Sequence, residues 1–128
     1  MRRSIIDSFP DADISGCIAW IAMLEGDTEV TARQSARIVE DPRFRHFHDP
    51  EKRSGTAIAE RMGGQDRVAW DIYLFFAKGS EWQEDPPSPT HWMHQLSASW
   101  ANPAHFHYGD GLVEELHKTM TRLADKRP

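Results

Sequence analysis

Histidine is the residue type with the most capacity for chemistry in this sequence of 128 residues, which contains seven of them. Four form two His-x-His pairs, His46/His48 and His105/His107, and an extended backbone would place both members of a pair on one face. Zinc sites need three or four ligands, of which neutral imidazole is a frequent one. One hypothesis is therefore a site for zinc or another divalent metal at His105 and His107. The alternative is that these side chains are solvated or cap backbone groups.

Asp71 is the one charged residue in the apolar segment 68–76 (VAWDIYLFF). A buried carboxylate is costly unless it is hydrogen-bonded or paired with a charge. We therefore interpret Asp71 either as a general base or polar anchor in a cleft, or as a structural acceptor for loop N–H groups or an arginine. The candidate binding cleft that we predict consists of Trp70, Asp71, His46, His94 and Trp100.

The segment 97–109 (SASWANPAHFHYG) gathers three aromatic residues and two histidines. Aromatic loops of this kind can form recognition sites, and packing over a sheet is the alternative. Phosphate-binding loops, dinucleotide-binding fingerprints, nucleophile elbows and His-Glu-x-x-His motifs do not occur in the sequence.

The single cysteine, Cys17, excludes an intrachain disulfide, a Cys-x-x-Cys pair and a cysteine-built zinc site. It lies within the apolar run 14–24 (ISGCIAWIAML), and no Lys or Arg is adjacent to it in sequence. A free cysteine in such a run typically packs as a small hydrophobic residue. We therefore expect Cys17 to be buried.

Composition limits the class of protein. The net charge is −5 and the mean hydropathy is −0.64. A chain of 14.7 kDa buries roughly two-thirds of its unfolded surface, which suffices for one core and predicts one domain over residues 1–128. Mild acidity argues against nucleic-acid binding, and no apolar run approaches the ~20 residues of a membrane span. Without a signal-peptide pattern, a cytoplasmic location is expected.

Hydrophobic periodicity and capping residues predict the elements that position these side chains. Helices are expected at the start of the chain (residues 4–9), after an Asp27 or Thr28 cap, from Asp49 to the Gly63-Gly64 pair, and after an Asp110 cap. On the last of these helices, the apolar residues at helical spacing are expected to face inward: Leu112, Leu116, Met120 and Leu123. Strands are expected at 14–24, 43–48, 68–76 and 91–96. Helical crossovers make the first strands parallel, and the short connection around residues 78–89 makes the last pair antiparallel. The sequence therefore predicts an α/β fold with a mixed sheet.

Three segments, RFRHFHDPEKRSGTAIAERMG, RVAWDIYLFF and AKGSEW, resemble the second half of thioredoxin-fold proteins of the thiol-disulfide oxidoreductase and peroxiredoxin type. The corresponding points are Phe44–Asp49, Gly63, Val68–Phe76 and Gly79. More narrowly, DPRFRHF, AWDIYLFF and WMHQL resemble a group of bacterial thioredoxin-like proteins. The resemblance covers roughly residues 4–124 and implies a three-layer thioredoxin-like fold with a mixed sheet.

The sequence departs from the thioredoxin pattern at its reactive end. The family's first strand and its Cys-x-x-Cys have no counterpart in residues 1–128, so the resemblance implies an N-terminally shortened domain. Asp66-Arg67-Val68 also lacks the family's cis-proline. Dithiol exchange needs two thiols. The resemblance therefore implies a thioredoxin-like protein without dithiol redox activity, with a binding or assembly role.

A shortened sheet would leave apolar surface for a partner to cover, so we expect a homodimer or another protein partner. Two alternatives stay open at this point. The reactive residue of a thiol oxidoreductase could lie upstream of Met1, or the protein could bind metal through its histidines.

Overall fold

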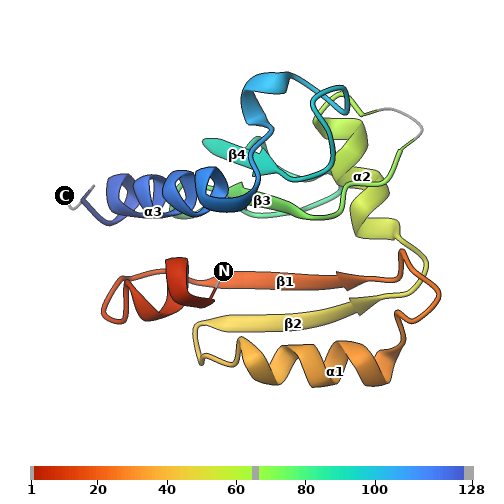
Figure 1. The fold of residues 1–128 in the computed structure, drawn as a ribbon, viewed down its shortest axis with the longest axis horizontal. Coiled ribbons are helices and arrows are strands. Elements are labelled where there is room, and N and C mark those ends of the chain that lie inside the picture. The colour runs from red at the N-terminus through yellow and green to blue at the C-terminus, as the bar shows by residue number, and fades with distance from the viewer. Residues whose placement is uncertain (1, 65–66, 126–128) are drawn as a thin grey trace. The chain divides into compact units, whose positions relative to one another are not determined.

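The computed structural model describes residues 2–64 and 67–125, which belong to two compact units. Unit 1 consists of residues 1–50 and 109–128, and unit 2 consists of residues 51–108 (Figure 1). The chain is mixed α/β, as predicted. Its four described strands form two separate two-stranded sheets, β1–β2 and β3–β4. The prediction of one mixed sheet is therefore wrong for this structure, since the described strands form two separate pairs. A single domain over residues 1–128 stays a prediction.

Unit 1 contains a parallel β-α-β arrangement, as the crossover rule predicts. β1 (Gly16–Ile21) and β2 (Phe44–Asp49) pair in parallel, and α1 (Glu29–Ile38) connects them and runs alongside β2 (Figure 1). Thr28 caps α1, because its hydroxyl accepts from the Thr31 N–H at 3.2 Å while the Thr31 hydroxyl accepts from the Thr28 N–H at 2.8 Å. This reciprocal capping box satisfies N–H groups that no helical carbonyl can reach.

One face of the β1–β2 sheet is open. Alternate residues Cys17, Ala19, Arg45 and Phe47 are exposed, whereas their neighbours along each strand are half-buried. The expected burial of Cys17 is therefore wrong. The physical reason is that this two-stranded sheet has a helix along one face only, so the period of two exposes every second side chain.

The remaining elements of unit 1 form a small helical core. η1 (Arg2–Asp7) packs against α3 (Gly109–Asp125). The buried apolar side chains are Ile5, Ile6, Leu112, Leu116 and Met120. The inward face of α3 was thus predicted correctly for Leu112, Leu116 and Met120.

Arg43 connects the turn before β2 to the segment after η1. It pairs with the Asp41 carboxylate at 2.9 Å and donates to the carbonyl oxygens of Phe9 at 2.7 Å and Ala12 at 3.2 Å. Hydrogen bonding from the Arg43 side chain is the main reason that the pKa of Asp41 lies below its ordinary value.

Unit 2 contains α2 (Arg53–Arg61), β3 (Ile72–Phe75), β4 (His91–His94) and the short helix η2 (Pro103–His105). β3 and β4 are antiparallel, as predicted, with Ile72 opposite His94 and Phe75 opposite His91. The core of this unit gathers Ala59, Ala69 and Trp100. Gly64 lies so close to Trp100 that a Cβ atom added there would be 2.9 Å from Cζ2 of the indole.

The predicted start of the second helix is wrong. We expected Asp49 as its N-cap and Pro50 as its first residue, but α2 begins at Arg53 after Lys52, whose φ is 60°. Asp49 is instead the last residue of β2, where it pairs with Ile21. Its carbonyl also accepts from the Ala22 N–H at 3.3 Å, so strand pairing outweighs the local capping signal.

Among the described residues, no helix combines the length and apolar character that crossing a membrane requires.

Candidate functional site

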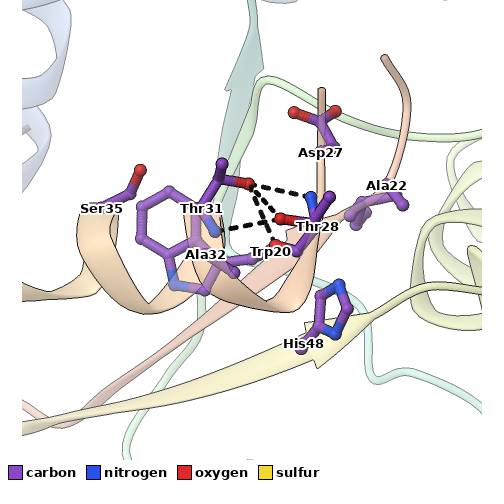
Figure 2. A pocket seen from close by; sticks show the side chains of 9 residues that line it. Trp20, Ala22, Asp27, Thr28, Thr31, Ala32, Ser35 and His48 are labelled. Atoms are coloured by element: carbon purple, nitrogen blue, oxygen red, sulfur yellow. Dashed lines mark hydrogen bonds between the residues drawn. The ribbon is translucent and has the colours of Figure 1, made fainter. Parts of the chain in front are cut away.

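A pocket of about 160 Å³ opens in unit 1 where β1 ends and α1 begins (Figure 2). We call it the strand-end pocket; its lining residues are Trp20, Ile21, Ala22, Asp27, Thr28, Thr31, Ala32, Ser35 and His48. Ligands of parallel α/β sheets commonly bind at the carboxyl ends of the strands. An apolar cavity of roughly 150 Å³ holds benzene, so this pocket has the size for a small organic molecule.

Strand register brings two of the lining side chains together. Trp20 on β1 and His48 on β2 are direct partners in the parallel ladder, and α1 adds Thr31, Ala32 and Ser35. In the view of Figure 2, the indole of Trp20 lies beside Ser35, and the imidazole of His48 lies on the other side of the pocket.

His46 holds the indole of Trp20 in place. The Trp20 Nε1–H donates to Nδ1 of His46 at 3.1 Å, and the two rings are nearly parallel, with an interplanar angle of 8° and centroids 6.1 Å apart. Because its N–H group is occupied, Trp20 contributes ring surface rather than a hydrogen-bond donor to the pocket. His46, predicted as a cleft residue, thus positions a pocket side chain and does not itself line the pocket.

The threonine hydroxyls of the pocket already have partners. Thr28 and Thr31 form the capping box, and the Thr31 hydroxyl also donates to backbone oxygens, such as that of Gly26 at 3.1 Å. Asp27 Oδ2 accepts from the N–H groups of Met23 at 3.0 Å and Leu24 at 2.7 Å. Within the described part of the chain, Asp27 Oδ1 has no hydrogen bond and remains able to accept one.

His48 also has a polar atom whose bonding is incomplete. Its Nε2 atom is buried and has no hydrogen-bond partner among the described residues. A buried polar atom without a partner costs about 1–3 kcal/mol, and such atoms are rare in folded proteins.

A second group of aromatic rings lies in unit 2 and contains two of the predicted cleft residues. We call it the histidine–tryptophan cluster: Trp92, His94, Trp100, His105 and Phe106. The His94 ring lies 5.1 Å from Trp100 and 5.8 Å from Phe106, and His105 stacks on Trp92 at 4.0 Å, all between ring centroids.

His94 is fully buried, at 0% exposure. Its Nδ1 accepts from the Leu96 N–H at 3.2 Å, while its Nε2 has no partner among the described residues. Burial is the main reason that the pKa of His94 lies below its ordinary value of 6.5, and charge on His105 and His107 acts in the same direction. These contacts fill the space around His94, so the cluster is a packed core.

The metal hypothesis at His105 and His107 stays a prediction. His105 ends the short helix η2, so the pair does not share the face of a strand. Its Nδ1 lies 2.8 Å from the carbonyl oxygen of Trp92 and therefore donates to it. Across residues 2–64 and 67–125, no group of three or more His, Cys, Asp or Glu side chains is arranged to hold a metal ion.

Asp71 lies outside the apolar environment that the sequence suggested. Asp71 is exposed, and its φ is 49°. This backbone angle is not that of a strand, so β3 begins only at Ile72. The Asp71 carbonyl accepts from the Gln95 N–H at 3.0 Å. Burial of Tyr73 is the main reason that the pKa of Tyr73 lies above its ordinary value, and the negative charge of Asp71 acts in the same direction. The premise of a buried carboxylate is wrong, and Asp71 is a surface residue.

The five residues of the predicted cleft are distributed over both units. His46 belongs to unit 1, whereas Asp71, half-buried Trp70, His94 and Trp100 belong to unit 2. The structure brings His94 and Trp100 together within unit 2. Sequence reasoning missed the strand-end pocket, although its signal was present: a capping pair, Asp27-Thr28, directly after an apolar strand.

A comparison with known proteins finds no matching family model, no matching curated protein and no matching solved structure.

Proposed function

We propose that this chain is a thioredoxin-like protein without dithiol chemistry that acts by binding a small molecule in the strand-end pocket. The single observation that carries the binding role is the pocket itself, a cavity of about 160 Å³ at the carboxyl end of β1 that Trp20, Asp27 and His48 help to line. The presence of only one cysteine, exposed Cys17, supports a role that needs no pair of thiols.

The test is a nuclear magnetic resonance screen of small fragments against the full chain. Binding in the pocket would shift the indole resonance of Trp20 and the amide resonances of Ser35 and His48. Ala32→Leu fills the pocket without a large change in helix propensity and should abolish these shifts. Gln34→Leu, at an exposed position of the same helix, is the matched control and should leave them intact. Shifts that persist in Ala32→Leu would contradict the proposal.

The thioredoxin-like part of the proposal concerns the directions of the strands. Its support is that β1 and β2 are parallel while β3 and β4 are antiparallel, which are the directions that the resemblance implies. An experimental structure in which either pair runs in the opposite sense would contradict it.

We also propose that the chain forms a homodimer through the open face of the β1–β2 sheet. Phe47 on this face is 52% exposed and lies among exposed Cys17 and Ala19. Apolar side chains that gather on one open face favour association. Phe47→Glu should then convert a dimer into a monomer in sedimentation experiments, whereas Val113→Glu, at a residue 50% exposed on α3, should not. A monomeric parent protein at micromolar concentration would refute this dimer.

A further inference from the structure

We infer that the strand-end pocket binds a small organic cation, such as an alkyl- or arylammonium ion; this inference rests on the proposed function. The charges around the pocket point to this class of ligand. Its lining contains the carboxylate of Asp27 and no Lys or Arg side chain. Residues 20–32, which run from the end of β1 into α1, contain Glu25, Asp27 and Glu29 and no Lys or Arg. An anionic ligand would therefore meet like charge and no basic partner.

The positive end of α1 does not reverse this preference. The N-terminus of a helix carries the equivalent of roughly half a positive charge, which favours anions. Asp27 precedes the Thr28 cap and contributes a full negative charge at the same place, and Glu29 adds another in the first turn. Glu29 is paired with Arg33, so Asp27 remains to set the sign of the potential in the pocket.

The atoms that face the pocket complement an ammonium ion attached to a small apolar group. Asp27 Oδ1 is able to accept from the ammonium, since only Oδ2 is used by backbone N–H groups. The Trp20 indole offers its ring surface, and a cation within about 6 Å of an indole face is attracted to it. Ile21, Ala22 and Ala32 line the pocket with apolar surface.

Three probes of nearly equal size separate charge from shape: benzylammonium, benzyl alcohol and benzoate. Titration into the full chain, followed through the Trp20 indole resonance and the Ser35 amide, gives three dissociation constants. An exposed ion pair together with a cation–π contact corresponds to about a tenfold preference for benzylammonium over benzyl alcohol. Benzoate should bind more weakly than the alcohol. Higher salt should weaken benzylammonium binding and leave the alcohol unaffected.

Asp27→Asn should remove most of the preference for benzylammonium and leave the affinity for benzyl alcohol unchanged. Glu40→Gln removes the same charge just beyond the opposite end of α1 and should change neither affinity. Because Asp27 also accepts from two backbone N–H groups, the salt dependence of the parent protein tests the same claim without a variant.

The outcomes distinguish failure of the proposed small-molecule pocket from failure of the cation inference. If none of the three probes shifts the pocket resonances, the proposed small-molecule pocket itself fails, and the cation inference fails with it. If benzyl alcohol or benzoate binds as tightly as benzylammonium, the pocket stands and the cation inference is overturned. Loss of the preference in Glu40→Gln, or its retention in Asp27→Asn with native amide dispersion, would also overturn it.

Discussion

Replacement of His94 by Phe should remove an acid-sensitive element from unit 2 while preserving its packing. His94 is enclosed by Trp92, Trp100 and Phe106, with ring centroids 5.1–5.8 Å from its own. A phenyl ring retains these aromatic contacts. It loses the acceptor for the Leu96 N–H and removes the buried Nε2 that lacks a partner in the described structure.

Two opposing contributions set the effect at neutral pH. Loss of the hydrogen bond to Leu96 costs about 1 kcal/mol, and removal of the unpaired buried nitrogen recovers about 1–3 kcal/mol. At pH 7.5 the variant should therefore be between equally stable and about 2 kcal/mol more stable than the parent. This range follows from hydrogen bonding alone, because the packing contacts are kept.

A lower pH should increase the difference in stability between His94→Phe and the parent protein. Burial lowers the pKa of His94 in the folded state below its ordinary value of 6.5, so the unfolded chain takes up this proton at a higher pH than the folded protein. The contribution of His94 to stability is therefore complete above about pH 6.5 and is lost as the pH falls below it. One proton changes stability by at most about 1.4 kcal/mol per pH unit, or about 2 kcal/mol between pH 6.5 and 5.

Urea unfolding at several pH values checks this prediction. The amide of Ala69 reports on unit 2, because this residue is fully buried and donates to the Gly55 carbonyl at 2.8 Å. His117→Phe makes the same substitution at an exposed histidine and should retain the pH dependence of the parent. If His94→Phe loses as much stability as the parent between pH 7.5 and 5, then His94 is not the acid-sensitive group and the reasoning is refuted.

Two further predictions concern packing and capping, and thermal unfolding measures both. Gly64→Ala should destabilise unit 2 by about 1–3 kcal/mol, because its Cβ would lie 2.9 Å from the Trp100 ring. Gly111→Ala is the control: this residue lies in α3 and an added Cβ would have no atom within 4 Å, so the substitution should stabilise the protein by up to about 1 kcal/mol. Thr28→Ala removes the acceptor of the Thr31 N–H and should cost about 1 kcal/mol, whereas Thr28→Ser should cost little. An unchanged unfolding midpoint for Gly64→Ala, or equal losses for the two Thr28 variants, would contradict these accounts.

The parts of the fold that sequence reasoning predicted correctly depend on short-range rules. Thr28 caps α1 through contacts three residues away, and the stripe of Leu112, Leu116 and Met120 on α3 follows the helical period. The parallel pairing of β1 with β2 follows from the helix between them. In each case, neighbouring residues along the chain contain the information that determines the structure.

The incorrect predictions depend on contacts that local patterns do not encode. Asp49 and Pro50 match a helix start, but pairing of Asp49 with Ile21 extends β2 through this position. Asp71 adopts a positive φ, so the apolar segment around it is strand only from Ile72 onward. Cys17 lies in an apolar run, yet its side of β1 has no covering element within unit 1.

The strand-end pocket likewise depends on contacts that local sequence patterns do not encode. Trp20 and His48 were each assigned correctly to a strand, but their meeting depends on the register that places them opposite each other. That register fixes which member of the pair His46/His48 receives the indole N–H and which one lines the pocket. A motif count treats both histidines as equal, whereas strand pairing gives them different roles.

Hydrogen-bond partners, more than the number of histidines, decide what these imidazoles can do. Nδ1 accepts an N–H group in both His46 and His94, so a neutral ring carries its proton on Nε2 and has no lone pair there for a metal. His105 shows the opposite tautomer, with Nδ1–H donating to the Trp92 carbonyl, but its ring is stacked on Trp92 within a packed cluster. His48 combines a place in a pocket with a buried nitrogen that no described group satisfies.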